Sequence, residues 1–216
     1  MTPSPSPAPL RALTAPVWVL LVLCILPELV FQLNDLGLLW PAGLREVAFS
    51  AGSFQSDLVS GGRSLFAGQP FTMFLTYMFL HTGLSHLVVN MAGLIWLWRL
   101  VAESRPAGDA ALFFVMSSIG AAMAFDILGG PHTAMVGASG ALFGLLGVYG
   151  VDSRLFWTDP RHTGLAQRLS RLVVIAGILI ASDLVSRVAT GTNVAWQAHT
   201  GGFLTGAFAA MIWPHR

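Results

Sequence analysis

Six apolar runs, separated by short polar connections, constrain the fold of this chain more than any other feature. The runs cover about residues 15–33, 77–100, 110–128, 139–149, 169–188 and 196–213. A helix needs about 20 mostly apolar residues to cross a bilayer, and a spanning segment must satisfy its backbone polar groups internally. The alternating ten-residue segments of a membrane barrel are not seen. The sequence therefore predicts an all-α fold, a polytopic membrane bundle of six transmembrane helices.

Composition supports a membrane protein and excludes several classes of function. Hydrophobic residues make up 55% of the 216 positions and charged residues only 10%, which is wrong for a soluble globular domain. Cys24 is the single cysteine, so the chain can form no internal disulfide and no cysteine zinc site. We expect the lipid bilayer as its surroundings, with no nucleic-acid partner, no metal and no cofactor.

The chain divides into a short tail and one domain. Residues 1–14 carry proline at every second position from 3 to 9, which predicts a disordered cytoplasmic tail. The six-span domain covers residues 15–216. Its first loop, about residues 34–70, keeps Trp and Phe among glycines and prolines, so we expect an ordered loop that partly enters the membrane interface.

Arginine accounts for all eleven basic residues, and its distribution indicates the orientation. If the chain crosses at each run, the side of the amino terminus holds Arg11, Arg99, Arg105, Arg154, Arg161, Arg168, Arg171 and Arg216, and the opposite side holds Arg45, Arg63 and Arg187. Cytoplasmic loops carry the excess of arginine, so both termini are expected in the cytoplasm. We expect an integral protein of a bacterial inner membrane.

Ser139 lies in the glycine-rich stretch Met135–Gly144, at the start of the fourth apolar run. The flanking Gly137 and Gly140 lack a Cβ, so they permit a tight turn and the close approach of other groups. Two interpretations are open at this point. Either Ser139 is a nucleophile at the mouth of a helix, or it is a helix N-cap beside a glycine face that packs against another helix.

The apolar run that follows Ser139 is short. About a dozen residues precede Asp152, and at 1.5 Å per residue they do not cross a hydrocarbon core about 30 Å thick. The start of this run must then lie below the membrane surface, where irregular backbone is tolerated only beside protein or a water-filled cavity. We therefore expect Ser139 to line an aqueous pocket that opens to the extracytoplasmic side.

Two histidine-containing segments place further polar groups in apolar surroundings. His86 and Asn90 are four residues apart in the second run and share a helical face. In the sixth run His199 precedes Gly202 and Gly206, a small-xxx-small pair that favours close helix packing. Taken alone, each group is equally well explained as a buried polar side chain bonded between helices.

The expected topology places His86, Ser139 and His199 near the outer ends of their helices. Close packing of the fourth and sixth helices would bring His199 within hydrogen-bond reach of Ser139, and a general base activates a hydroxyl in this geometry. His86 and Asn90 would then offer donors to a developing oxyanion, together with the backbone N–H of Ser139.

Together these motifs resemble those of rhomboid intramembrane serine proteases, of the bacterial type with a six-span core. The matching segments are Gly137-Ala-Ser139-Gly140, Ala198-His199 with Gly202 and Gly206, and His81 with His86 and Asn90. They occur in the family's order and in the corresponding spans, and the resemblance covers about residues 15–216. Three such motifs in order are far more specific than a lone Gly-x-Ser-Gly.

The resemblance implies a serine endopeptidase that cleaves transmembrane segments of single-span or polytopic membrane proteins near their extracytoplasmic ends. It implies a Ser-His dyad without an acidic third member. The implied site residues are Ser139 as nucleophile and His199 as general base and acid; His86, Asn90 and Gly137 for the oxyanion and substrate; and His81, Phe143, Gly202 and Gly206 in support.

The sequence departs from the family pattern at three places. Phe143 stands where the family often has a tyrosine stacked on the base, so the ring is kept and the hydroxyl is lost. The stretch Gln69–Met73 stands in place of a Trp-Arg pair in the first loop, and Glu103 is about one residue out of register with a structural glutamate.

Two other classes of protein fit the sequence less well than a protease does. A non-catalytic rhomboid-like protein that binds transmembrane clients would typically lack the serine or the histidine, and this chain has both. A small transporter would show repeated halves, which are not found. Glu28, Asp126 and Asp183 are interpreted as structural groups, helix caps or interface groups.

Overall fold

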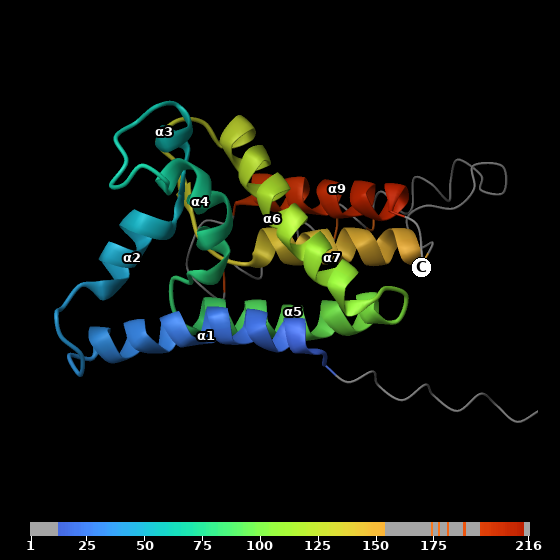
Figure 1. Ribbon diagram of the computed structural model, residues 1–216, viewed down its shortest axis with the longest axis horizontal. Coiled ribbons are helices and arrows are strands. Elements are labelled where there is room, and N and C mark those ends of the chain that lie inside the picture. Colours follow the sequence, from blue (N-terminus) through green and yellow to red (C-terminus); the bar gives the residue numbers. More distant parts are fainter. Residues whose placement is uncertain are drawn as a thin grey trace, which may run out of the picture.

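The computed structural model describes residues 13–153 and 195–213, together with four isolated helical positions at 174, 177, 181 and 188. The described helices are α1 (Ala15–Asp35), α2 (Leu44–Gly52), α3 (Ser56–Val59), α4 (Gln69–Thr76), the 3₁₀ helix η1 (Tyr77–Phe79), α5 (Leu84–Ala102), α6 (Ala107–Gly129), α7 (Ser139–Asp152) and α9 (Trp196–Ile212). Two short strands, β1 (Phe54–Gln55) and β2 (Ala134–Met135), pair antiparallel. Helix α1 lies beside α5, and α7 lies beside α9, with α6 crossing that second pair (Figure 1).

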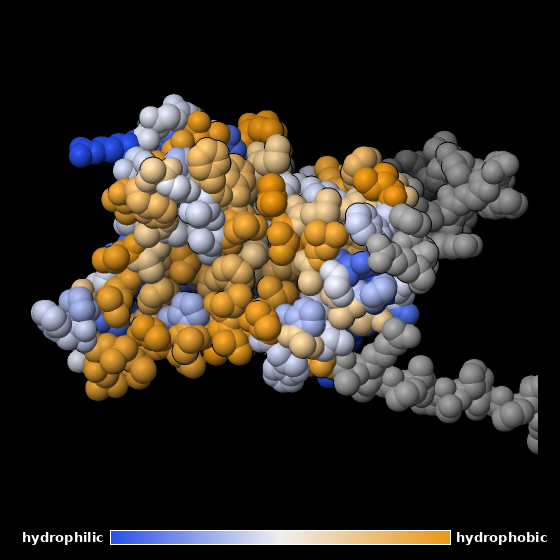
Figure 2. Space-filling model, in the orientation of Figure 1, coloured by the Kyte–Doolittle hydropathy of each residue, from blue (hydrophilic) through white to orange (hydrophobic). Residues whose placement is uncertain are grey.

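Three of the described helices, α1, α5 and α6, are long and apolar enough to cross a membrane. Large apolar side chains of α1 point outward, and a soluble protein rarely exposes a contiguous patch of this kind. They include Trp18, Val22, Leu26, Leu29 and Leu33, which are 42–58% exposed. Apolar side chains gather along the edge of the molecule formed by α1 (Figure 2). The protein is an integral membrane protein built as a helical bundle.

The observed helices follow the predicted runs with one clear shift. The second helix, expected from about residue 77, begins at Leu84, because the chain turns through His81–Gly83 after η1. Helix α7 has 14 residues; at 1.5 Å per residue it is about 21 Å long, too short to cross the hydrocarbon core. The fifth expected helix, residues 169–188, lies outside the described residues except for the isolated positions. The number of spans and the arginine orientation stay predictions, because several of those arginines also lie outside the described residues.

The first loop contains more helix than its sequence predicts. Helices α2 and α3 and the start of α4 all form within the range expected to be a loop, and β1 pairs with β2 just ahead of α7. Gln69, in the stretch that departs from the family pattern, is buried and ties this region together. Its side chain accepts a hydrogen bond from the backbone N–H of Leu65 at 2.7 Å and donates to the carbonyl of Ser50 at 2.6 Å. The loop is therefore a packed unit held against the bundle.

Helices α7 and α9 touch through their backbones. A Cβ added to Gly202 would collide with the carbonyl oxygen of Gly140, and one added to Gly206 would collide with that of Gly144. Small residues let two helices approach this closely, whereas larger side chains would hold the helices apart. The close approach fixes the relative position of the amino-terminal turns of the two helices.

A buried ion pair fastens the other end of the same helices. Arg105, just after α5, bonds both carboxylate oxygens of Asp152 at the end of α7, at 2.7 and 2.8 Å. It also donates to the carbonyls of Ala210 and Trp213 at the end of α9. The side chains of Arg105 and Asp152 are each 1% exposed. One arginine thus ties together the ends of α5, α7 and α9.

Candidate active site

Ser139 is the first residue of α7, and the turn that precedes it depends on glycine. Gly137 has φ +115°, a conformation that side-chain-bearing residues rarely adopt. Its N–H donates to the carbonyl of Tyr77 at 2.9 Å, which ties the turn to η1. The N-cap position of α7 belongs to Ala138. The interpretation of Ser139 as an N-cap is therefore wrong, and its hydroxyl is available for another contact.

That contact is with a histidine from the neighbouring helix. Ser139 Oγ and His199 Nε2 are 2.9 Å apart, a normal hydrogen-bond distance. His199 lies in the first turn of α9 and is 3% exposed. The ring of Phe143, one turn along α7 from Ser139, stacks on the imidazole with centroids 4.3 Å apart and an angle of 26°. Stacking restricts the imidazole to the plane in which its Nε2 meets the hydroxyl.

His86 and Asn90 face this pair from α5. The ring of His86 lies directly against the backbone ahead of Ser139, because a Cβ on Gly137 would be 2.7 Å from its Cε1 and 2.8 Å from its Nε2. Asn90 donates one amide hydrogen to the carbonyl of His86 at 2.9 Å. The amide has two hydrogens, so a second donor is left for a ligand.

These two pairs of residues, Ser139 with His199 and His86 with Asn90, line one cavity of about 940 Å³. His86, Asn90, Ser139 and His199 all contribute to its wall. Apolar residues of α5 and α7 complete it, among them Val89, Trp96, Leu142 and Leu146. This volume is within the range of small-molecule and peptide sites, and a mostly apolar wall with a few convergent polar groups is typical of such sites.

His81 lies behind the cavity wall. It is fully buried in the connection ahead of α5, and its ring meets that of His86 edge-on, with centroids 5.1 Å apart. Burial, and to a smaller extent the neighbouring His86, lowers the pKa of His81 to about 3. The imidazole of His81 is therefore neutral at physiological pH, and it contacts the ring of His86.

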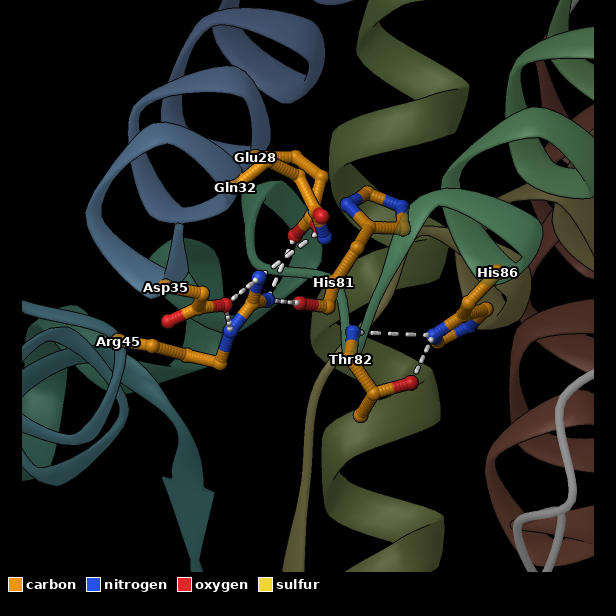
Figure 3. A network of polar contacts seen from close by, with 7 residues as sticks. All are labelled: Glu28, Gln32, Asp35, Arg45, His81, Thr82 and His86. Atoms are coloured by element: carbon orange, nitrogen blue, oxygen red, sulfur yellow. Dashed lines mark hydrogen bonds and ion pairs between the residues drawn. The ribbon is translucent and has the colours of Figure 1, made fainter. Parts of the chain in front are cut away.

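The structure also brings two residues to the site region that the sequence analysis did not assign to it. Thr82 contacts Nδ1 of His86, and Arg45 of the first loop reaches the carbonyl of His81 (Figure 3). Glu28, interpreted as structural, is fully buried in α1 and accepts two hydrogen bonds from Arg45. A carboxyl inside an apolar run needs a cation, so Glu28 was a signal that could have led to a partner such as Arg45.

The described part of the chain shows no cluster of metal-binding side chains in this region. Within residues 13–153 and 195–213, no group of three or more His, Cys, Asp or Glu side chains is placed to hold a metal ion. Asp126 lies in the last turn of α6. Asp183 lies outside the described residues.

The fold and this site define a class: a helical integral membrane protein that pairs a serine with a histidine inside the bundle. The model of the Rhomboid domain matches residues 68–216, and the chain belongs to the rhomboid family. The matched region contains every candidate site residue. It begins just before α4, so Arg45 and Glu28 lie outside it.

The chain is also similar to several plant proteins. It is 33% identical over 132 residues to RHOMBOID-like protein 2 of Arabidopsis thaliana, covering 61% of this chain and 39% of that protein. It is 30% identical over 141 residues to RHOMBOID-like protein 7 of the same plant, covering 65% and 43%. The match to RHOMBOID-like protein 6, mitochondrial, is 33% over 132 residues, covering 61% and 40%. The chain thus spans about two fifths of the length of these relatives.

Proposed function

We propose that this protein is an intramembrane serine endopeptidase that cleaves transmembrane segments of other membrane proteins. The observation that carries the proposal is the 2.9 Å contact between Ser139 Oγ and His199 Nε2, with Phe143 stacked on the base. A hydroxyl is a weak nucleophile until a neighbouring base takes its proton, and this pair has the required geometry. Membership of the rhomboid family supports the same reaction.

The proposed reaction uses the two residues in sequence. Ser139 Oγ attacks the scissile carbonyl while His199 Nε2 accepts the hydroxyl proton. The same imidazole then donates that proton to the leaving amine, and an acyl-enzyme remains on Ser139. A water molecule activated by His199 hydrolyses the ester and restores the serine.

Negative charge develops on the carbonyl oxygen during attack, and the site offers donors to it. His86, Asn90 and Ser139 all line the cavity, and we propose the His86 ring, the second amide hydrogen of Asn90 and the backbone N–H of Ser139 as the donors. Donors fixed in place before the reaction stabilise the oxyanion without reorganisation, and each is typically worth about 10²–10³ in kcat. Gly137 serves this arrangement by leaving room for the His86 ring.

The substrates we propose are single-span or polytopic membrane proteins, cut near their extracytoplasmic ends. Helix α7 is too short to cross the core, and this supports a position of Ser139 below the membrane surface, beside a cavity that water can enter. We further propose six spans, cytoplasmic termini, a site open to the extracytoplasmic side and residence in a bacterial inner membrane. Reporter fusions at each end of the chain test that orientation.

Cleavage of a tagged panel of single-span proteins, coexpressed with this protein, tests the proposed function. We expect fragments whose new ends map inside the transmembrane segment, and their complete loss in Ser139→Ala. Ser60→Ala, at an exposed serine of the first loop, is the matched control and should cleave normally. If Ser139→Ala cleaves at the wild-type rate, the proposal is wrong. If intact substrates copurify with wild type and no fragment forms, the protein is a rhomboid-like binding protein.

A further inference from the structure

Arg45, in the first loop, is held with unusual completeness for an arginine near the surface of a bundle. Its fork bonds both carboxylate oxygens of Glu28, at 2.8 and 3.1 Å, and Asp35 accepts from Nε and Nη2 at 3.0 and 2.8 Å. A fifth bond runs from Nη1 to the carbonyl of His81 at 2.9 Å. A guanidinium has five N–H donors, so every one is used.

The guanidinium of Arg45 stays protonated in this position. Burial alone would lower the pKa of its guanidinium, but the bonds to Glu28 and Asp35 outweigh burial and raise that pKa. Glu28 is in turn fully buried and accepts a further bond from Gln32 at 2.8 Å. A bidentate pair of this kind fixes orientation as well as charge.

The carbonyl that Arg45 holds belongs to the same peptide group as the N–H of Thr82. On its far side this peptide group faces His86: the N–H of Thr82 is 3.5 Å from Nδ1, and the Thr82 hydroxyl is 3.1 Å from it (Figure 3). A cation bonded to the carbonyl polarises the amide and strengthens its N–H as a donor. Arg45 is thereby connected to the imidazole of His86 through one amide.

This contact favours one tautomer. A backbone N–H can only donate, so its contact with Nδ1 of His86 favours the form in which Nδ1 presents its lone pair, and in that form the Thr82 hydroxyl donates as well. In a neutral imidazole one nitrogen carries the proton and the other accepts. The favoured tautomer carries its proton on Nε2, the nitrogen that lies against Gly137 beside Ser139.

We propose that Arg45 is a positioning residue for His86: through the peptide group that joins His81 to Thr82, it holds His86 in the tautomer that donates from Nε2. The inference rests on the proposed function, because His86 needs a donor at Nε2 only if an oxyanion forms beside it. It extends the site to Arg45 of the first loop and to Thr82, which also lines the cavity. A purely structural role for Arg45 would stabilise the loop and leave the tautomer of His86 unaffected.

Nitrogen NMR of the histidine rings reads the tautomer directly and needs no substrate. Protein labelled with ¹⁵N-histidine in detergent at pH 8, where an imidazole is neutral, gives a correlation pattern that distinguishes Nε2–H from Nδ1–H. The signals of His86 are identified by their loss in His86→Asn. We expect the Nε2–H pattern in wild type. Thr82→Val loses the hydroxyl, the nearer of the two donors to Nδ1, and keeps the weaker backbone N–H, so we expect it to show an added share of the Nδ1–H tautomer. Thr82→Ser keeps the hydroxyl and should restore the wild-type pattern.

The role of Arg45 is tested with a variant in which the buried carboxylate of Glu28 is not left without a partner. Arg45→Gln combined with Glu28→Gln removes both charges of the bidentate pair, and thermal unfolding shows whether the double variant folds. We expect it to show mixed tautomers of His86 and a kcat lowered about 10- to 100-fold with little change in KM. Arg63→Gln, an exposed arginine of the same loop, is the matched control and should match wild type in both measurements.

The outcomes separate this inference from the proposed function. An Nδ1–H pattern for His86 in wild type overturns the inference, as does a wild-type pattern in both Thr82→Val and the folded double variant. If Thr82→Val shifts the tautomer while the double variant does not, Thr82 acts without Arg45 and the role of Arg45 is refuted. Cleavage by Ser139→Ala would instead remove the proposed function and leave the tautomer result standing as a property of the fold.

Discussion

Gly137→Ala tests how closely the site depends on the contact between the His86 ring and the turn ahead of Ser139. The new Cβ would lie 2.7 Å from Cε1 of His86, whereas non-bonded carbon atoms are comfortable at about 3.5–4.0 Å. The ring must therefore retreat by about 0.8 Å or more. A donor placed for a hydrogen bond of about 2.9 Å then falls outside bonding distance. We expect kcat to fall about 10²–10³-fold, the cost of one oxyanion donor.

The same substitution also costs stability, by two separable effects. Alanine at φ +115° carries backbone strain of about 1–3 kcal/mol, and overpacking against His86 adds about 1–3 kcal/mol. Gly61→Ala isolates the first effect, because Gly61 has φ +87° and a Cβ there meets nothing within 4 Å. Thermal unfolding in detergent and cleavage of a purified single-span substrate are the measurements. If Gly137→Ala and Gly61→Ala have the same kcat and the same unfolding midpoint, the steric reasoning is refuted.

Three further substitutions test the packing and the buried charges, each by thermal unfolding in detergent. Gly206→Val should push α9 away from α7, which should lower stability by about 1–3 kcal/mol and abolish cleavage. Gly108→Ala is the control, because its Cβ meets nothing within 4 Å, and it should change neither stability nor cleavage. Arg105→Met removes the cation bonded to the buried Asp152 and should cost about 3–5 kcal/mol; an unchanged midpoint would contradict this. The pKa of His81 is about 3 in the folded protein and near 6.5 in the unfolded chain. Between these values only the unfolded chain binds the proton, so the stability present above about pH 6.5 should be lost as pH falls toward 3, by about 1.4 kcal/mol per pH unit. His81→Phe should flatten that slope, and an equal slope in both proteins would count against the assignment.

The sequence predicted the long helices well because their length and apolarity are local properties. Runs of about 20 apolar residues are helical in a bilayer whatever they pack against, so α1 and α6 were expected close to their observed bounds, and α5 close to its observed end. The close approach of α7 and α9 also has a local signal, since Gly202 and Gly206 repeat at helical spacing. That spacing led to the expectation that Ser139 and His199 meet, and the two side chains do lie 2.9 Å apart.

The first loop was predicted less well because its order depends on distant partners. Helices α2 and α3 are short and have no long apolar run, and they are held by side chains such as Gln69. The bond from Arg45 to the carbonyl of His81 joins residues 36 positions apart, and no periodicity announces it. The second helix starts late for a similar reason: the break at His81–Gly83 forms where these tertiary contacts replace helical hydrogen bonds.

Labelling of the purified protein with a fluorophosphonate, followed by mass spectrometry of its peptides, shows directly whether His199 activates the hydroxyl of Ser139. The reagent forms a covalent bond with a serine only where a base activates the hydroxyl. We expect one label per chain, on Ser139, and a loss of labelling of at least about 100-fold in His199→Ala. A label on another residue, or equal labelling of wild type and His199→Ala, would contradict a Ser139–His199 catalytic pair.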